Sequence, residues 1–86
     1  MDIKIDGSKI HNKQELFAEI KKQMKHFEFF GNNLDALYDV LTSINEEITV
    51  DIHNEAVLIE HFGQYYQSLL QVFNDCKHIS IFKHTL

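Results

Sequence analysis

Three short segments in which isoleucine or valine alternates with other residues constrain the fold of this chain more than any other feature. They fall at residues 3–5, 48–52 and 79–82, and such alternation is typical of strands with one buried face. The stretches between them are much longer than hairpin turns and carry apolar residues at helical spacing. The strands are therefore expected to pair in parallel through right-handed helical crossovers.

Four helical segments are predicted between these strands, two in each crossover. Asn12, Asn33 and Asn54 are expected to cap the first three, with Glu15 completing a capping box at the first and Gly63 ending the third. The predicted inward-facing residues are Leu16, Phe17, Ile20, Met24 and Phe27 in the first helix, Leu34, Leu37, Leu41 and Ile44 in the second, and Tyr66, Leu69, Leu70 and Phe73 in the fourth.

The predicted fold class is therefore α/β, a three-stranded parallel sheet covered by about four helices in the order β-α-α-β-α-α-β. A chain of 86 residues is long enough for one core, so a single domain over residues 1–86 is expected.

Charge is distributed unevenly along the chain. Residues 26–76 carry nine acids and no Lys or Arg, whereas residues 1–25 and 77–86 each have a net charge of +2. A nucleic-acid-binding surface needs cations to neutralise phosphates, so no nucleic-acid partner is expected. The acidic segment should instead attract basic partners, unless it serves only to keep the protein in solution.

Membrane insertion and secretion are not expected. No apolar run is long enough to span a bilayer, and the first residues do not form a basic stretch followed by an apolar one. The single cysteine, Cys76, excludes a disulfide within the chain and suits a reducing compartment. A cytoplasmic location is the resulting expectation.

Patterns that carry catalysis or metal binding are missing from the sequence. The six histidines form no HxH or HExxH motif, so they are predicted to be scattered over the surface without a metal. Three isolated glycines cannot form a phosphate-binding loop, and Cys76 is expected to be a small buried residue at the end of the fourth helix. We therefore expect neither an enzyme nor a cofactor or small-molecule substrate.

Two aspartates are the sharpest candidate for a binding function. Asp35 and Asp39 are four residues apart, so they share one face of the second helix, away from the leucines. The helix dipole favours Asp35 in the first turn, whereas nothing comparable favours Asp39. A solvated face is the alternative interpretation. A catalytic pair is less consistent with the spacing, because carboxylates on adjacent turns of one helix do not flank a cleft.

An aromatic loop leads directly into this helix. One of Phe29 and Phe30 is expected in the core, and the other is a candidate anchor for a protein partner. Gly31 is expected either to form a turn with positive φ or to let a partner approach the backbone closely.

Two segments resemble the barstar family. Its signature of an aromatic pair, Gly, a polar residue, Asn-Leu-Asp-Ala-Leu, an aromatic and Asp is matched by Phe29-Phe30-Gly31-Asn32-Asn33-Leu34-Asp35-Ala36-Leu37-Tyr38-Asp39. A second match is Leu70-Gln71-Val72-Phe73 followed by Asp75 and Lys77. The resemblance implies an inhibitor that binds a basic ribonuclease of the barnase type inside the producing cell and covers its active site with the second helix and the preceding loop.

The resemblance also implies roles for individual residues. Asp39 would replace a substrate phosphate among the enzyme's Arg and His side chains, Asp35 would pair with cations at the rim, and Asp75 would meet another basic group. The complete set of partner-binding positions that it implies is Phe29, Gly31, Asn33, Leu34, Asp35, Tyr38, Asp39, Thr42, Ile44 and Asp75.

Several positions depart from the family pattern. Phe29 replaces a common Tyr, Tyr38 and Ile44 stand where Trp occurs, and Asp75 is shorter than the usual Glu. These differences suggest a different cognate nuclease or weaker binding. The alternative function is an interaction or antitoxin module of the same fold that binds another basic protein or a toxin nuclease.

Overall fold

A computed structural model describes residues 1–24 and 31–84 of the chain. Phe27, predicted to face inward from the first helix, and the aromatic pair of the loop lie outside the described residues. The elements in chain order are β1 (Asp2–Asp6), the 3₁₀ helix η1 (Gly7–Lys9), α1 (Lys13–Gln23), α2 (Leu34–Ser43), β2 (Ile48–His53), α3 (Glu55–Phe62), α4 (Gln64–Asn74) and β3 (Ile79–His84). The predicted order is confirmed, with η1 added.

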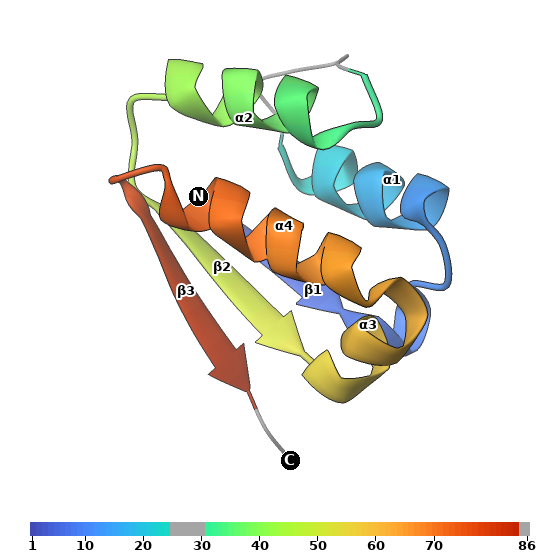
Figure 1. Ribbon diagram of the computed structural model, residues 1–86. Helices are drawn as coiled ribbons and strands as arrows, with labels where there is room; N and C mark the ends of the chain where they lie inside the picture. The colour runs from blue at the N-terminus through green and yellow to red at the C-terminus, as the bar shows by residue number, and fades with distance from the viewer. Residues whose placement is uncertain (25–30, 85–86) are drawn as a thin grey trace.

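The strands form one parallel sheet in the order β1-β2-β3, as predicted (Figure 1). The register places Ile3 beside Val50 and Val50 beside Ile81, so apolar residues line up across one face. Because successive strand residues point to opposite faces, the polar row that contains Lys4 and Asp51 belongs to the other face. The helices cover the apolar face in Figure 1.

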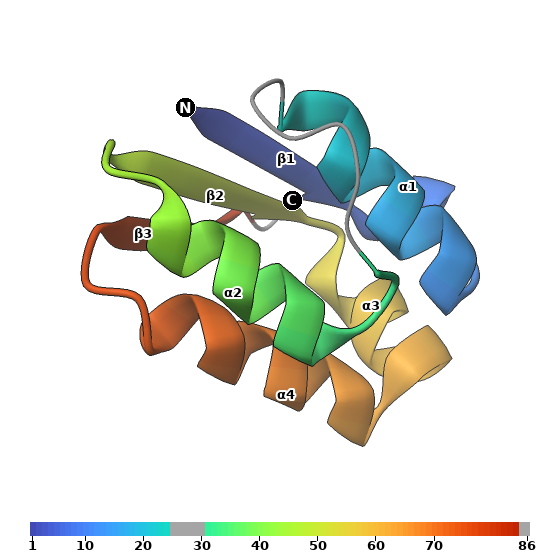
Figure 2. The ribbon, with the colours of Figure 1, turned by 90° about the horizontal axis from the view of Figure 1, so that it is seen from above.

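Helix α1 packs on β1 and helix α4 packs on β3, and α2 lies alongside α4 (Figures 1 and 2). The predicted inward residues of all three helices are buried, with one exception within the described residues. Leu34 is only half-buried, because it is the first residue of α2 and packs at the margin of the core. Met24 follows the last residue of α1 and is buried.

Two of the predicted asparagine caps are confirmed. The Oδ1 atoms of Asn12 and Asn33 accept hydrogen bonds at 2.8 Å from the backbone N–H groups of Glu15 and Ala36, which fixes where α1 and α2 begin. The capping box differs from the prediction by one position. Glu15 Oε1 accepts the N–H of His11 at 2.8 Å and not that of the cap residue.

The predicted cap at Asn54 is confirmed in position, because Asn54 is the N-cap residue of α3. Its backbone is left-handed (φ 56°, ψ 49°), however, and its side chain makes no capping bond. Its Nδ2 donates instead to Asp6 Oδ1 at 2.7 Å, which joins the ends of β1 and β2. Gly63 ends α3 as predicted, and its positive φ of 54° places α4 directly after the bend.

The outer edge of β1 is occupied by a side chain of α1. The Lys4 N–H donates to Gln23 Oε1 at 2.6 Å, and Gln23 Nε2 donates to the Lys4 carbonyl at 2.8 Å. The amide of Gln23 thus imitates a neighbouring strand at this position, which blocks edge-to-edge pairing there.

Hydrogen bonds to Asp6 make the stability depend on pH. Bonds from Asn54 and then Ser8 stabilise the ionised carboxyl and lower its pKa from 3.8 to about 2. Since the folded-state pKa lies below the unfolded one, this contribution is present above about pH 4 and is lost as the pH falls through about 2. In urea unfolding, we expect the stability difference between wild type and Asp6→Asn to shrink over that range. A constant difference would contradict the assignment.

Candidate partner-binding surface

Helix α2 separates an acidic face from an apolar one. Asp35 and Asp39 are exposed, whereas Leu37 and Leu41 are fully buried in the core. This division follows from the helical period, and the Asn33 cap fixes where the first turn of the helix begins. The face that was predicted from the spacing of the two aspartates is therefore present in the structure.

The carboxylates of Asp35 and Asp39 make no polar contact within the described part of the chain. None of the hydrogen bonds or ion pairs among residues 1–24 and 31–84 involves either side chain. Two other acids of the 26–76 segment do have partners within the described residues: Asp51 contacts His84 at 2.8 Å, and Glu55 contacts Lys83 at 3.1 Å. The acidic face of α2 can therefore accept cationic groups from outside the described residues.

Two further predicted contact residues surround these acids. The Tyr38 side chain, between them in sequence, is 39% exposed and offers an aromatic surface. The Thr42 side chain is also exposed, but its hydroxyl lies 3.0 Å from the carbonyls of Tyr38 and Asp39, so its proton is bound within the helix. Thr42 thus has less to offer a partner than the resemblance implied.

A side-chain contact and a glycine define residues 31–33, directly before α2. Lys21 Nζ of α1 donates to Asn32 Oδ1, a contact that the sequence did not indicate. Gly31 is exposed, and a Cβ atom at this position would lie 2.9 Å from the Nδ2 atom of Asn33. Glycine here therefore leaves room for the cap. Phe29, predicted to contact the partner, lies outside the described residues.

Two predicted contact residues near the C-terminal end of α2 differ in their exposure. Ile44 is 7% exposed and belongs to the core, so it cannot offer a surface to a partner; its inward-facing prediction is confirmed and its place in the contact set is a correction. Asp75 is exposed at the C-cap of α4, which ends beside the C-terminal end of α2 (Figure 2). Its Oδ1 accepts from Gln71 Nε2 at 2.8 Å.

His78 is a residue near this surface that sequence reasoning missed. Its Nε2 lies 2.9 Å from the carbonyl oxygen of Leu41 in the last turn of α2. Its own carbonyl accepts from the Ile48 N–H at 3.0 Å, where β2 begins. No local pattern could have indicated this contact, because it joins residues that are far apart in sequence.

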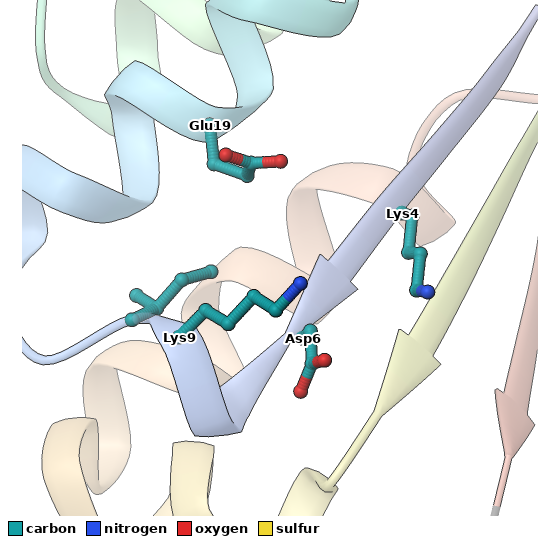
Figure 3. Close-up of a pocket in the computed structure, with 5 residues that line it drawn as sticks. Lys4, Asp6, Lys9 and Glu19 are labelled. Atoms are coloured by element: carbon teal, nitrogen blue, oxygen red, sulfur yellow. The ribbon is translucent and has the colours of Figure 1, made fainter.

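A small hollow lies away from this surface within the described residues. A hollow of about 50 Å³ lies between β1, η1 and α1, where Lys9 approaches Asp6 (Figure 3). Pockets for organic ligands are usually about 300–1,000 Å³, so this hollow has room for water only. Its lining residues are Lys4, Asp6, Lys9, Ile10 and Glu19.

The histidines are less scattered than predicted. The register of β2 and β3 brings together His53 and His84, whose rings stack with centroids 4.3 Å apart. Among residues 1–24 and 31–84, no three His, Cys, Asp or Glu side chains are arranged to hold a metal ion. Cys76 is buried, as predicted, and burial followed by the charge of Asp75 raises the pKa of its thiol.

Comparison with known proteins points in one direction. Residues 1–81 match the family model described as "Barstar (barnase inhibitor)". The curated protein "Putative ribonuclease inhibitor YrdF" of Bacillus subtilis (strain 168) is 29% identical over 74 residues, which cover 85% of this chain and 81% of that protein. None of the helices in the described ranges is long and apolar enough to cross a membrane.

Proposed function

The chain belongs to the barstar family, and on that premise we propose that it inhibits a basic ribonuclease of the barnase type inside the cell. Inhibition requires no catalysis by the inhibitor, because α2 and the preceding loop cover the active site of the enzyme. The observation that carries the proposal is the pair Asp35 and Asp39, both exposed on one face of a helix whose opposite face is anchored in the core.

The chemistry of a ribonuclease site explains why carboxylates suit this purpose. Such a site is built to bind the phosphates of RNA, so it presents cationic donors in a fixed arrangement. A carboxylate in that position accepts several charge-assisted hydrogen bonds, which are shorter and stronger than neutral ones. Asp39, in the middle of α2, has the central role, and Asp35, one turn earlier, meets cations at the rim.

Residues around the two aspartates complete the proposed contact surface. Tyr38 supplies an exposed aromatic ring, and Gly31 with the loop containing Phe29 approaches the enzyme backbone. Asn33 acts indirectly by capping α2, and Leu34 contributes the part of its side chain that stays exposed. Asp75 binds a further basic group if its contact with Gln71 is exchanged on association.

Inhibition of RNA cleavage tests this proposal directly. A barnase-type ribonuclease is titrated with the folded protein while hydrolysis of an RNA substrate is followed. We expect activity to fall linearly to zero at one inhibitor per enzyme. Full ribonuclease activity at a large excess of folded protein would overturn the proposal and favour the alternative, an interaction module for a different basic protein.

Salt should slow association of the two proteins. The acidic segment attracts a basic enzyme over distances that salt screens, with a Debye length of about 10 Å at 0.1 M. We expect the association rate constant to fall about tenfold between about 0.02 M and 0.5 M NaCl, measured by stopped-flow fluorescence. Sucrose at matched osmolality is the control, and it should slow association no more than its viscosity does. A rate constant independent of salt would exclude electrostatic steering by this segment.

A further inference from the structure

The orientation of the acidic face depends on how α2 is attached to the rest of the protein. Helix α2 packs chiefly on α4, and a short connection over residues 44–47 joins it to β2. The burial of Leu37 and Leu41 holds the inner face of α2 in the core. Contacts at the ends of α2 act beside this packing and restrain sliding and rotation of the helix.

One such contact spans the whole α2–β2 connection. The side chain of His78 bonds the carbonyl of Leu41 near the end of α2, and its main chain bonds the N–H of Ile48 at the start of β2. A single residue of the α4–β3 connection thus holds both ends of the α2–β2 connection. His78 is half-buried, which strengthens the bond by excluding water from it.

The direction of this hydrogen bond is fixed by chemistry. A carbonyl oxygen only accepts, so Nε2 of His78 must carry the proton. Carbonyls in the last turn of a helix lack a helical N–H partner, and the one other donor to the Leu41 carbonyl among the described residues is the N–H of Ile44 at 3.3 Å. A donor at a helix C-terminus is also favoured by the helix dipole.

We propose that His78 is a positioning residue for the acidic face of α2. By holding the last turn of the helix against β2 and β3, it keeps Asp39 in the one placement that fits the partner. Without this bond, α2 also populates other placements, and the apparent affinity falls in proportion to the fraction that remains competent. This inference rests on the proposed function, since it concerns the same surface.

A matched control lies elsewhere in the molecule. His61 Nδ1 is 3.0 Å from the carbonyl of Ile10, so it also forms a histidine-to-carbonyl contact over a long sequence separation. That contact ties α3 to the segment after η1 and does not involve α2. Removing it should affect general stability in a comparable way without changing the placement of α2.

The test compares His78→Leu, His78→Gln and His61→Leu. Glutamine carries an N–H donor the same number of bonds from the backbone as histidine Nε2, whereas leucine has no donor. For His78→Leu, we expect the dissociation constant for the ribonuclease to be roughly three- to tenfold larger. The rate of amide hydrogen exchange over residues 38–44 of the free protein should rise by a similar factor. His78→Gln should restore both values, and His61→Leu should leave both unchanged.

The two readouts separate this inference from the proposed function. Unchanged affinity of His78→Leu for a ribonuclease that the wild type inhibits would overturn the role of His78 alone. If the wild type inhibits no ribonuclease, the exchange measurement decides, and unchanged exchange over residues 38–44 would overturn the positioning role. If His78→Leu does not fold, His78→Asn replaces it. Its amide is one bond too short to reach Leu41, so affinity equal to that of His78→Gln would overturn the proposal.

Discussion

Replacing Asp39 by alanine is expected to weaken ribonuclease binding by about 2–5 kcal/mol, roughly a 30-fold or larger loss of affinity. Most of this loss arises because the cationic groups of the enzyme site would be buried without a counter-charge. The effect should exceed that of any other single substitution on the surface. Isothermal titration calorimetry or an inhibition titration would measure it.

The free protein should tolerate the same substitution. Asp39 is exposed and makes no polar contact within the described residues, so no interaction of the folded state is lost. Alanine also has a higher helix propensity, and the repulsion between Asp35 and Asp39 disappears. The urea midpoint should therefore stay the same or rise slightly. A large fall in stability would mean that Asp39 has a structural role.

Asp35→Ala is the matched control for Asp39→Ala. It removes the same charge from the same face, so any general effect of net charge on association is equal in the two variants. Because Asp35 is assigned to the rim of the enzyme site, its removal should cost less affinity than that of Asp39. The opposite order would show that α2 sits on the enzyme in a different register. Wild-type affinity in Asp39→Ala would overturn the proposed mechanism.

Replacing Leu37 by alanine should have the opposite consequences. Leu37 is fully buried on the inner face of α2, so the shorter side chain leaves a cavity in the core. We expect the free energy of unfolding to fall by about 2–5 kcal/mol, a large share of the stability of a small domain. Urea unfolding followed by circular dichroism would measure the loss.

Folded Leu37→Ala protein should retain most of its affinity, because the acidic face is unchanged. The pair Leu37→Ala and Asp39→Ala therefore separates the two faces of α2, one measured by unfolding and the other by binding. An unchanged urea midpoint in Leu37→Ala would contradict the burial of this residue. If the variant unfolds at low temperature, Leu37→Met, which nearly conserves volume, should restore the fold.

The sequence alone determined those features that depend on residues a few positions apart. The alternation of Ile48, Val50 and Ile52 predicts a strand, and the caps at Asn12 and Asn33 predict where two helices begin. The division of α2 into an acidic and an apolar face is likewise set by its helical period. Parallel strand pairing was predictable too, because the long connections exclude hairpins.

Tertiary structure alone decided the contacts between residues that are distant in sequence. The pairing register of β2 and β3 stacks His53 on His84, and the Asn54 side chain bonds Asp6 in place of a backbone N–H of α3. The contact of His78 with Leu41 depends on how two connections meet beside the sheet. Spacing along the chain encodes neighbours within a turn or a strand, whereas these contacts depend on how whole elements pack, which no local pattern specifies.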